Sequence, residues 1–327
     1  MRSLFSDKRI ESALEIWKNA AAQIGLDEDT FDHKLLWQKD EPYRNHVVIA
    51  FNSPDRNLVL KQIFKKTSEK DPCAAALAQK NAHQVLANQE RAHAPELLFM
   101  SQDGSTVIME QVRGQTLDSH LSAGKDPVRL LRRTGQWLAR FHGATHEGSR
   151  IYQPKFMVNH IARIRSDVAD GNSGVADRDL FLQCCDLIPE IARGFEGQTS
   201  VSCAKHGDFN LRNIILGPDG ATAIDFKSHQ TAPVGFDICR ILLDYAELYQ
   251  DENDVESGKV LSAKTLSAFF DGYDFVKVGD PGVGFLQYVQ LLNDWRLIPV
   301  TPAHRSWRQA LRHEKISTLA KKAFGLN

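Results

Sequence analysis

A predicted β-hairpin in the middle of this chain constrains its fold more than any other feature. The turn is Gly217-Pro218-Asp219-Gly220, where proline presets one turn dihedral and glycine tolerates a positive φ. The flanking residues predict one strand over 213–216 and a returning strand over 221–226. Such a hairpin places Asn213 and Asp225 near the same open end.

Polar residues gather around this open end. The segment His206-Gly207-Asp208-Phe209-Asn210-Leu211-Arg212-Asn213 precedes the hairpin, and Asp225 stands twelve residues after Asn213. Carboxylate and carboxamide oxygens suit a hard cation such as Mg²⁺, and the carboxylate of Asp208 suits a hydroxyl that must lose its proton. The alternative is a loop whose Asp and Asn residues only cap and turn the backbone. We favour the site, because the two-part spacing and the hairpin agree.

In these two motifs the chain resembles the aminoglycoside phosphotransferase and choline kinase family, which shares a fold with protein kinases. Members carry His-Gly-Asp, four residues, then Asn, and later Ile-Asp-Phe or Ile-Asp-Trp. The resemblance implies an α+β, bilobed protein-kinase-like fold, with a small β-rich N-terminal lobe holding one main helix and a larger, mostly helical C-terminal lobe. It further implies a nucleotide-binding lobe over residues 1–112 and a catalytic and substrate-binding lobe over residues 113–327.

The resemblance also implies roles for the motif residues. Asp208 would accept or orient the proton of a substrate hydroxyl. Asn213 and Asp225 would hold Mg²⁺ on the phosphates of ATP. Phosphoryl transfer needs mainly positioning and charge neutralisation from the protein, and these groups could supply both.

The nucleotide contacts are predicted from position in the small lobe. Lys61 lies in an apolar strand whose alternation can turn its side chain inward, so we expect it to bind the α- and β-phosphates, with Lys65 and Lys66 as competitors. The segment around 109–114 resembles the connector between the lobes. There, the Glu110 carbonyl and the Val112 amide would hydrogen-bond adenine.

The remaining elements follow from hydrophobic periodicity and turn residues. An amphipathic helix is predicted over 10–24, and another from Asp126-Pro127 to about His142. Further elements are strands at 33–37, 46–51, 57–64, 96–100 and 106–110, with a turn at 53–56 and a helix over 72–88. Apart from the hairpin, the chain beyond Gly114 is predicted to be helices and loops.

Two departures from the family pattern affect the nucleotide site. The turn at 39–45 lacks glycine, and residues 72–89 contain no acid to pair with the phosphate-binding lysine. Gln79 occupies about the place of the usual glutamate, with His83 one turn later. These departures keep an alternative open, namely a degenerate kinase-fold protein that binds nucleotide or a partner without catalysis.

Three residues beside the motifs have structural and chemical interpretations. His206 is predicted to brace the loop, and Asp237 resembles a family position that anchors it. Arg212 could stabilise charge on the transferred phosphoryl group or form a structural ion pair, and the sequence does not separate these two roles.

The predicted acceptor is a hydroxyl group of a small molecule: an amino alcohol, a sugar, an amino sugar or an aminoglycoside-like compound. Only twelve residues separate Asp225 from Asp237, too few for the activation segment of a protein kinase. Acids between Asp244 and Glu256 favour a cationic acceptor, whereas seven basic residues against one acid from Arg296 onward favour an anionic or neutral one. The acceptor therefore stays open.

Composition limits the partners and the cellular location expected for the chain. The chain has 327 residues and a net charge of −1, which gives no general attraction to nucleic acid or membranes. Its start lacks an apolar segment of signal-peptide length, and no apolar run is long enough to span a membrane. Five cysteines without Cys-x-x-Cys spacing predict reduced thiols. We therefore expect a cytoplasmic monomer or homodimer.

Overall fold

The computed structural model describes residues 8–41, 44–65, 71–227 and 230–326. The chain forms two compact units. Unit 1 comprises Met1–Gly114 and Ile215–His229, and unit 2 comprises Gln115–Ile214 and Gln230–Asn327. Lys66, one of the competitors of Lys61, and part of the predicted glycine-free turn lie outside the described residues.

A five-stranded antiparallel sheet forms the centre of unit 1. Its strands are arranged in the order β1 (Asp32–Glu41), β2 (Arg44–Asn52), β3 (Asn57–Lys65), β6 (Thr106–Glu110) and β5 (Leu97–Met100). A turn joins β2 to β3, where the Ser53 amide donates to the Arg56 carbonyl at 2.8 Å. The five strands predicted for this region are confirmed, and β1 is longer than expected.

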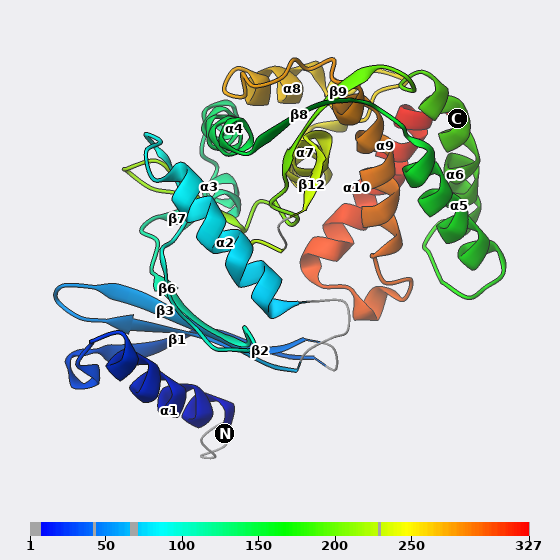
Figure 1. The fold of residues 1–327 in the computed structure, drawn as a ribbon. Coiled ribbons are helices and arrows are strands. Elements are labelled where there is room, and N and C mark those ends of the chain that lie inside the picture. Colours follow the sequence, from blue (N-terminus) through cyan, green and yellow to red (C-terminus); the bar gives the residue numbers. More distant parts are fainter. Residues whose placement is uncertain (1–7, 42–43, 66–70, 228–229, 327) are drawn as a thin grey trace. The chain divides into compact units, whose positions relative to one another are not determined.

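Two helices cover opposite faces of this sheet (Figure 1). Helix α1 (Lys8–Gln23) buries its apolar stripe, and Trp17 stacks on Phe51 with ring centroids 3.8 Å apart. Leu58 and Leu60 belong to the same core, so the alternation of β3 directs Lys61 away from α1 and toward the face that carries α2 (Pro72–Leu86). Both predicted helices are confirmed.

The predicted hairpin is present, formed by β10 (Ile214–Leu216) and β11 (Ala221–Ala223). Strand β11 also pairs in parallel with the short β4 (Ala92–His93). Gly220 has φ +145°, and a Cβ atom there would lie 2.4 Å from the Arg91 carbonyl oxygen. Only glycine permits this approach. The returning strand ends at Ala223, three residues before the predicted end, so Asp225 lies in the loop that follows.

Helices make up most of unit 2. They are α3 (Leu117–Ser122), α4 (Pro127–Ala144), α5 (Lys155–Ala169), α6 (Arg178–Arg193), α7 (Gly235–Tyr249), α8 (Ala263–Phe270), α9 (Pro281–Arg296) and α10 (Trp307–Phe324). Short 3₁₀ turns occur at Glu252–Asp254 and Pro302–His304, and one at Glu28–Thr30 in unit 1. The predicted helix near 127–142 is confirmed, and Asp126 caps it by accepting from the Val128 amide at 3.0 Å.

Unit 2 also contains a sheet that the sequence did not predict. Strand β9 (Thr199–Ala204) lies between β8 (His146–Ile151) and β12 (Thr231–Pro233), and both pairings are antiparallel. The short β7 (Gln115–Thr116) was missed as well. The prediction of helices and loops alone beyond Gly114 was therefore wrong for these segments, whose sequences lack an alternating apolar pattern.

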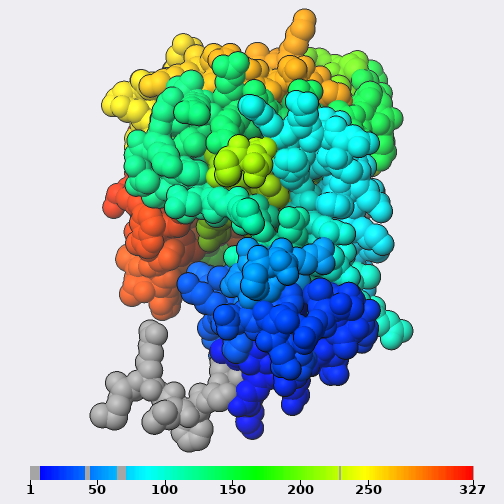
Figure 2. Space-filling model, turned by 90° about the vertical axis from the view of Figure 1, so that its left-hand side faces the viewer, coloured from blue at the N-terminus to red at the C-terminus, as the bar shows by residue number. Residues whose placement is uncertain are grey.

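Helix α7 is the buried centre of unit 2, and α9 and α10 pack against it (Figure 1). The C-terminal segment that includes α10, orange to red, also forms part of the molecular surface (Figure 2). Four cysteines, Cys184, Cys185, Cys203 and Cys239, are buried, and none of the five forms a disulfide. No helix in the described part of the chain is long and apolar enough to cross a membrane.

Candidate active site

Unit 1 brings two of the predicted residues together. The Lys61 ammonium group on β3 forms an ion pair with Asp225 Oδ1, in the loop after β11. The side chain of Lys61 is 26% exposed and that of Asp225 is 42% exposed. Asp225 has a left-handed backbone, with φ +65°, which aspartate tolerates better than most residues. A cationic ammonium group and a carboxylate therefore lie side by side in unit 1.

The predicted adenine contacts lie at the end of β6. The Glu110 amide donates to the Glu96 carbonyl at 3.0 Å, and the Gln111 amide donates to the Asn57 carbonyl at 2.9 Å. Because the carbonyl of a strand residue points to the same side as its amide, the Glu110 carbonyl is directed toward the β5 side. Val112 follows in an irregular connection that ends at Gly114.

This connection lies against the hairpin. A Cβ atom at Gly114 would lie 2.7 Å from the Leu216 carbonyl oxygen, and one at Gly217 would lie 2.6 Å from the Arg113 carbonyl oxygen. The two glycines thus permit close backbone contact between the Glu110–Gly114 segment and the hairpin that leads to Asp225. Three predicted parts of the nucleotide site are consequently held in one small region of unit 1.

Gln79 does not take the place of the missing glutamate. Its side chain is buried, and Nε2 donates to the Pro95 carbonyl at 3.4 Å and to Met109 Sδ at 3.3 Å. His83 is likewise engaged, with Nδ1 2.9 Å from the Ala94 carbonyl oxygen. The carboxylate that pairs with Lys61 is Asp225, so the expected pairing of Gln79 with Lys61 is corrected.

In unit 2, the segment from His206 to Asn213, here called the 206–213 loop, is anchored by Asp237. Asp237 Oδ2 accepts from the His206 amide at 2.7 Å, and Oδ1 accepts from the Gly207 amide at 3.1 Å. Burial acts to raise the pKa of Asp237, but the hydrogen bond and charge of His142, 3.4 Å away, outweigh it and lower that pKa. The predicted anchoring by Asp237 is confirmed.

Hydrogen bonds inside the loop hold Asp208 and Asn213 together. Asn213 Nδ2 donates to the Asp208 carbonyl at 3.0 Å, so Asn213 Oδ1 is the atom that could ligate a cation. Asn210 Nδ2 donates to Asp208 Oδ1 at 3.2 Å, and the Asp208 amide donates to His206 Nδ1 at 3.3 Å. The predicted bracing role of His206 is confirmed, and its ring is fully buried.

Aromatic side chains pack against one side of the loop. The ring of Phe209 stacks on that of Trp137 in α4 with centroids 5.2 Å apart, and the His206 ring lies 5.5 Å from that of Phe209. Trp137 and Phe209 are fully buried. Apolar packing therefore fixes one side of a loop whose polar groups face the other way.

The other side of the loop contacts a network of charged residues on α7, α9 and α10. Arg240 Nε lies 3.8 Å from Asp208 Oδ1, and its NH1 donates to both carboxylate oxygens of Asp294, at 3.1 and 3.2 Å. Burial acts to lower the pKa of Arg240, but the charges of Asp294 and Asp208 outweigh it and raise that pKa. No local sequence pattern indicates these contacts, because they join segments far apart in the chain.

A second pair in this network anchors the loop backbone. Asp244 Oδ2 accepts from the Leu211 amide at 2.9 Å, and Asp244 Oδ1 forms an ion pair with Arg312 NH2. Arg312 Nε also lies 3.2 Å from Glu247 Oε2. Burial lowers the pKa of Arg312 to about 10, and the charges of Arg240 and Arg212 act in the same direction. Arg312 therefore remains cationic at neutral pH.

The same contacts explain the two opposing charge signals of the sequence. The acids of α7 and the basic residues of α10 neutralise one another, and Lys315 and Lys322 donate to the carbonyls of Gln250 and Glu252. The first two acids of the acidic run are therefore satisfied within the fold, whereas Asp251, Asp254 and Glu256 are exposed to solvent.

The residues present fit a divalent cation by their chemistry. Asn213 offers a carboxamide oxygen in unit 2, and Asp225 offers a carboxylate in unit 1, both hard oxygen donors of the kind that Mg²⁺ prefers. Within the described ranges, no group of three or more His, Cys, Asp or Glu residues is arranged to hold a metal by itself. A cation bound by either group would need further ligands, such as phosphate oxygens.

Comparison with known proteins places the chain in a family. The model of the phosphotransferase enzyme family matches residues 43–275, which is more than half of the chain. The chain belongs to this family. No curated protein sequence matches it.

Solved structures with the same fold are small-molecule kinases of low sequence identity. A spectinomycin phosphotransferase bound to ADP and spectinomycin has a TM-score of 0.58 at 10% identity, covering 98% of this chain and 99% of that one. An amicoumacin kinase bound to AMP-PNP and Ca²⁺ has a TM-score of 0.58 at 12% identity, covering 95% and 96%. A Plasmodium vivax ethanolamine kinase has a TM-score of 0.56 at 13% identity, covering 97% and 95%. The predicted family and the kinase-like α+β fold are confirmed.

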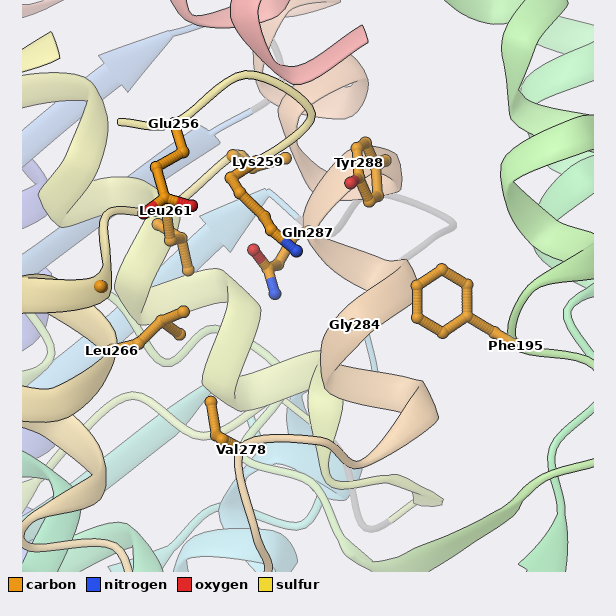
Figure 3. Close-up of a pocket in the computed structure, with 11 residues that line it drawn as sticks. Phe195, Glu256, Lys259, Leu261, Leu266, Val278, Gly284, Gln287 and Tyr288 are labelled. Atoms are coloured by element: carbon orange, nitrogen blue, oxygen red, sulfur yellow. The ribbon is translucent and has the colours of Figure 1, made fainter. Parts of the chain in front are cut away.

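A cavity of about 260 Å³ lies elsewhere on unit 2, between α9 and the segment before α8 (Figure 3). Lys259, Gln287, Tyr288 and Phe195 are among its lining residues. None of the predicted site residues lines this cavity, so it contributes nothing to the candidate active site.

Proposed function

We propose that this phosphotransferase family member is an ATP- and Mg²⁺-dependent kinase that phosphorylates a hydroxyl group of a small molecule. The observation that carries the proposal is the 206–213 loop. Its backbone amides donate to Asp237 and Asp244. It carries the Asp208 carboxylate and the Asn213 carboxamide, whose Nδ2 donates to the Asp208 carbonyl at 3.0 Å. A hydroxyl acceptor needs such a carboxylate, because its proton must leave as the new P–O bond forms.

In the proposed reaction, the acceptor oxygen attacks the γ-phosphorus of ATP. The bond between that phosphorus and the β–γ bridging oxygen breaks, and ADP leaves with its electron pair. Asp208 orients the hydroxyl and takes its proton, which then passes to solvent. Arg240, whose Nε lies 3.8 Å from Asp208, holds the carboxylate in position through its bonds to Asp294.

The family resemblance assigns the nucleotide contacts. Lys61 would contact the α- and β-phosphates, and the Glu110 carbonyl and Val112 amide would receive the adenine edge. Asn213 Oδ1 and Asp225 would hold Mg²⁺, which when bound neutralises phosphate charge. The relatives solved with AMP-PNP and Ca²⁺ or with ADP support an adenine nucleotide and a divalent cation as the donor pair.

The alternative of a non-catalytic nucleotide-binding protein loses one of the two sequence features that favoured it. One of its two grounds was a phosphate lysine without a carboxylate partner, yet Lys61 pairs with Asp225. Stabilisation of the protein by Mg-ATP, without turnover on any acceptor, would favour this alternative.

The decisive experiment is ATP consumption by the full chain, measured against amino alcohols, sugars, amino sugars, sugar acids and aminoglycosides. With an active acceptor, Asp208→Asn should lower kcat by about 10²- to 10⁴-fold while the protein stays folded. Asp167→Asn, an exposed aspartate of α5, is the matched control and should keep full activity. Unchanged turnover in folded Asp208→Asn protein would overturn the proposal.

A further inference from the structure

A β-bulge in β1 aligns a tryptophan with Lys61. The register of β1 against β2 shifts at Leu36, so that Trp37, rather than Leu36, pairs with Val48. Val48 in turn pairs with Lys61 on β3. Paired residues of neighbouring strands point to the same face of a sheet. The side chains of Trp37 and Lys61 therefore lie on one face of unit 1, two strands or roughly 10 Å apart.

The Trp37 side chain is 59% exposed on this face. Among the described residues, its ring stacks on no other aromatic ring, and its indole N–H forms no hydrogen bond. Helix α2 packs mainly along β4 and β5, and β5 is the edge strand opposite to β1. By contrast, Trp17, Trp137 and Trp295 are buried. The face beside Trp37 thus offers a large apolar ring and a hydrogen-bond donor to a ligand.

The residues of this face change from apolar to basic with distance from the predicted adenine contact at Glu110. The row of paired residues nearest to Glu110 is apolar and consists of Ala50, Val59 and Met109. The next row holds Trp37 and Lys61, and the row beyond it holds Lys39 and His46. This order matches a nucleotide whose base lies near Glu110 and whose phosphates lie at Lys61. Trp37 would then lie beside the ribose and the phosphates.

We infer that Trp37 is a further nucleotide-binding residue, whose ring packs on the ribose and whose indole N–H donates to a phosphate oxygen. This inference rests on the proposed kinase function and adds a residue to its nucleotide site. The turn over 39–45 contains no glycine, so its backbone amides are less free to approach a phosphate closely. An indole N–H is a donor that never accepts, and it supplies from a side chain the contact that such amides would make.

The first test is calorimetric titration of the full chain with Mg-ADP, which needs no turnover. Trp37→Ala should weaken binding about tenfold, because the stacked ring and the donor are both lost. Trp37→Phe keeps a ring without the N–H and should lose less. Leu35→Ala is the matched control and should bind like the parent. Leu35 belongs to the same strand and is 40% exposed, but it pairs with Ile49, which belongs to the core on the α1 side.

The second test uses the fluorescence of Trp37 itself. Mg-ADP should change the tryptophan emission of the parent, and Trp37→Phe should remove most of that change. Trp307→Phe removes an exposed tryptophan of unit 2 and should keep the change. With an active acceptor, Trp37→Ala should raise the KM for ATP and leave the KM for the acceptor unchanged. A full emission change in Trp37→Phe protein would show that the nucleotide does not reach this ring, and the inference would fail.

Failure of this inference can be told apart from failure of the kinase proposal. If the parent and folded Trp37→Ala protein bind Mg-ADP equally, the inference is overturned and the kinase proposal stands. If the parent binds neither Mg-ADP nor Mg-ATP, both are overturned. Size-exclusion chromatography examines the other use of an exposed ring. If Trp37→Ala changed the oligomeric state and left nucleotide affinity unchanged, Trp37 would belong to a contact between copies of the chain, which also overturns the inference.

Discussion

The candidate site residues of unit 1 and those of unit 2 are held in place in opposite ways. In unit 1, the side chains of Lys61 and Asp225 meet in one ion pair, and both are partly exposed to solvent. In unit 2, the 206–213 loop is tied through its backbone to Asp237 and Asp244, which are only 2% exposed. The first is a contact between partly exposed side chains, whereas the second is part of the core.

This difference decides which substitutions should affect the stability of the protein as well as its activity. An exposed ion pair contributes about 0–1 kcal/mol, so Lys61 and Asp225 can exchange one another for phosphate and a cation at small cost. A buried carboxylate that satisfies several donors cannot be removed without leaving those donors unpaired. We therefore expect substitutions of the site residues in the two units to affect activity alike and stability very differently.

The largest effect is expected at Asp237. Asp237→Ala should lower the free energy of unfolding by about 3–5 kcal/mol, because the amides of His206 and Gly207 and the ring of His142 lose their acceptor. Asp225→Ala should change it by less than about 1 kcal/mol, yet abolish measurable turnover. Urea denaturation of both variants measures the difference. Equal losses of stability would break the comparison between the units.

A smaller loss of stability is expected at Gln79, a buried residue of unit 1. Gln79→Glu should destabilise the protein by about 1–3 kcal/mol, since a carboxylate would replace the amide that donates to the Pro95 carbonyl. Gln79→Met, which removes the polar group and keeps the length, is the control and should cost less. If the Gln79→Glu variant were as stable as the parent and had a lower KM for ATP, residue 79 would lie beside Lys61 after all, contrary to the structure.

Glu247 provides a test of the buried network by pH. Its raised pKa means that the folded protein keeps a proton that the unfolded chain loses above a pH of about 4.3. The stability contributed by this group therefore falls as the pH rises from that value toward the raised pKa. Glu247→Gln should match the parent at pH 4 and exceed it by about 1 kcal/mol at pH 8 in thermal unfolding. Lower stability of the variant at pH 8 would instead show an ionised Glu247 paired with Arg312.

The smallest change in stability is expected at Lys61. Lys61→Ala should alter the free energy of unfolding by less than about 1 kcal/mol, because its partner is partly solvated. It should nevertheless raise the KM for ATP and lower kcat, if the ammonium group binds phosphate. A variant that binds Mg-ATP like the parent in calorimetric titration would remove Lys61 from the nucleotide site.

Local features of the fold could be predicted from the sequence, and contacts between distant segments could not. Helix α1 and the strands of unit 1 follow apolar periodicity, and the turn at Gly217–Gly220 has strong turn residues. Strands β8 and β9 were missed because their sequences, His-Glu-Gly-Ser-Arg-Ile and Thr-Ser-Val-Ser-Cys-Ala, lack a clear apolar alternation. Their hydrogen bonds to each other stabilise them, and such pairing cannot be recognised in the sequence of either strand alone.

The candidate site shows the same limit. The anchoring of the 206–213 loop by Asp237 could be predicted, since both belong to motifs that the family shares. The contacts of Arg240, Asp294 and Arg312 could not, because they join α7, α9 and α10. From the sequence, the acids of α7 favoured a cationic acceptor and the bases of α10 an anionic or neutral one. Their pairing with each other could not be predicted.

The hairpin also bears on how the protein is made. Residues 215–229 complete unit 1, but the hundred residues of 115–214 separate them from its first segment. A ribosome that adds 5–20 residues per second needs roughly ten seconds to supply them. Until then the nascent unit lacks the strand that pairs with β4 and the carboxylate that pairs with Lys61. Unit 1 emerges first but is completed only after the first segment of unit 2 has been made, so the pair of Lys61 and Asp225 cannot form until the middle of the chain is synthesised.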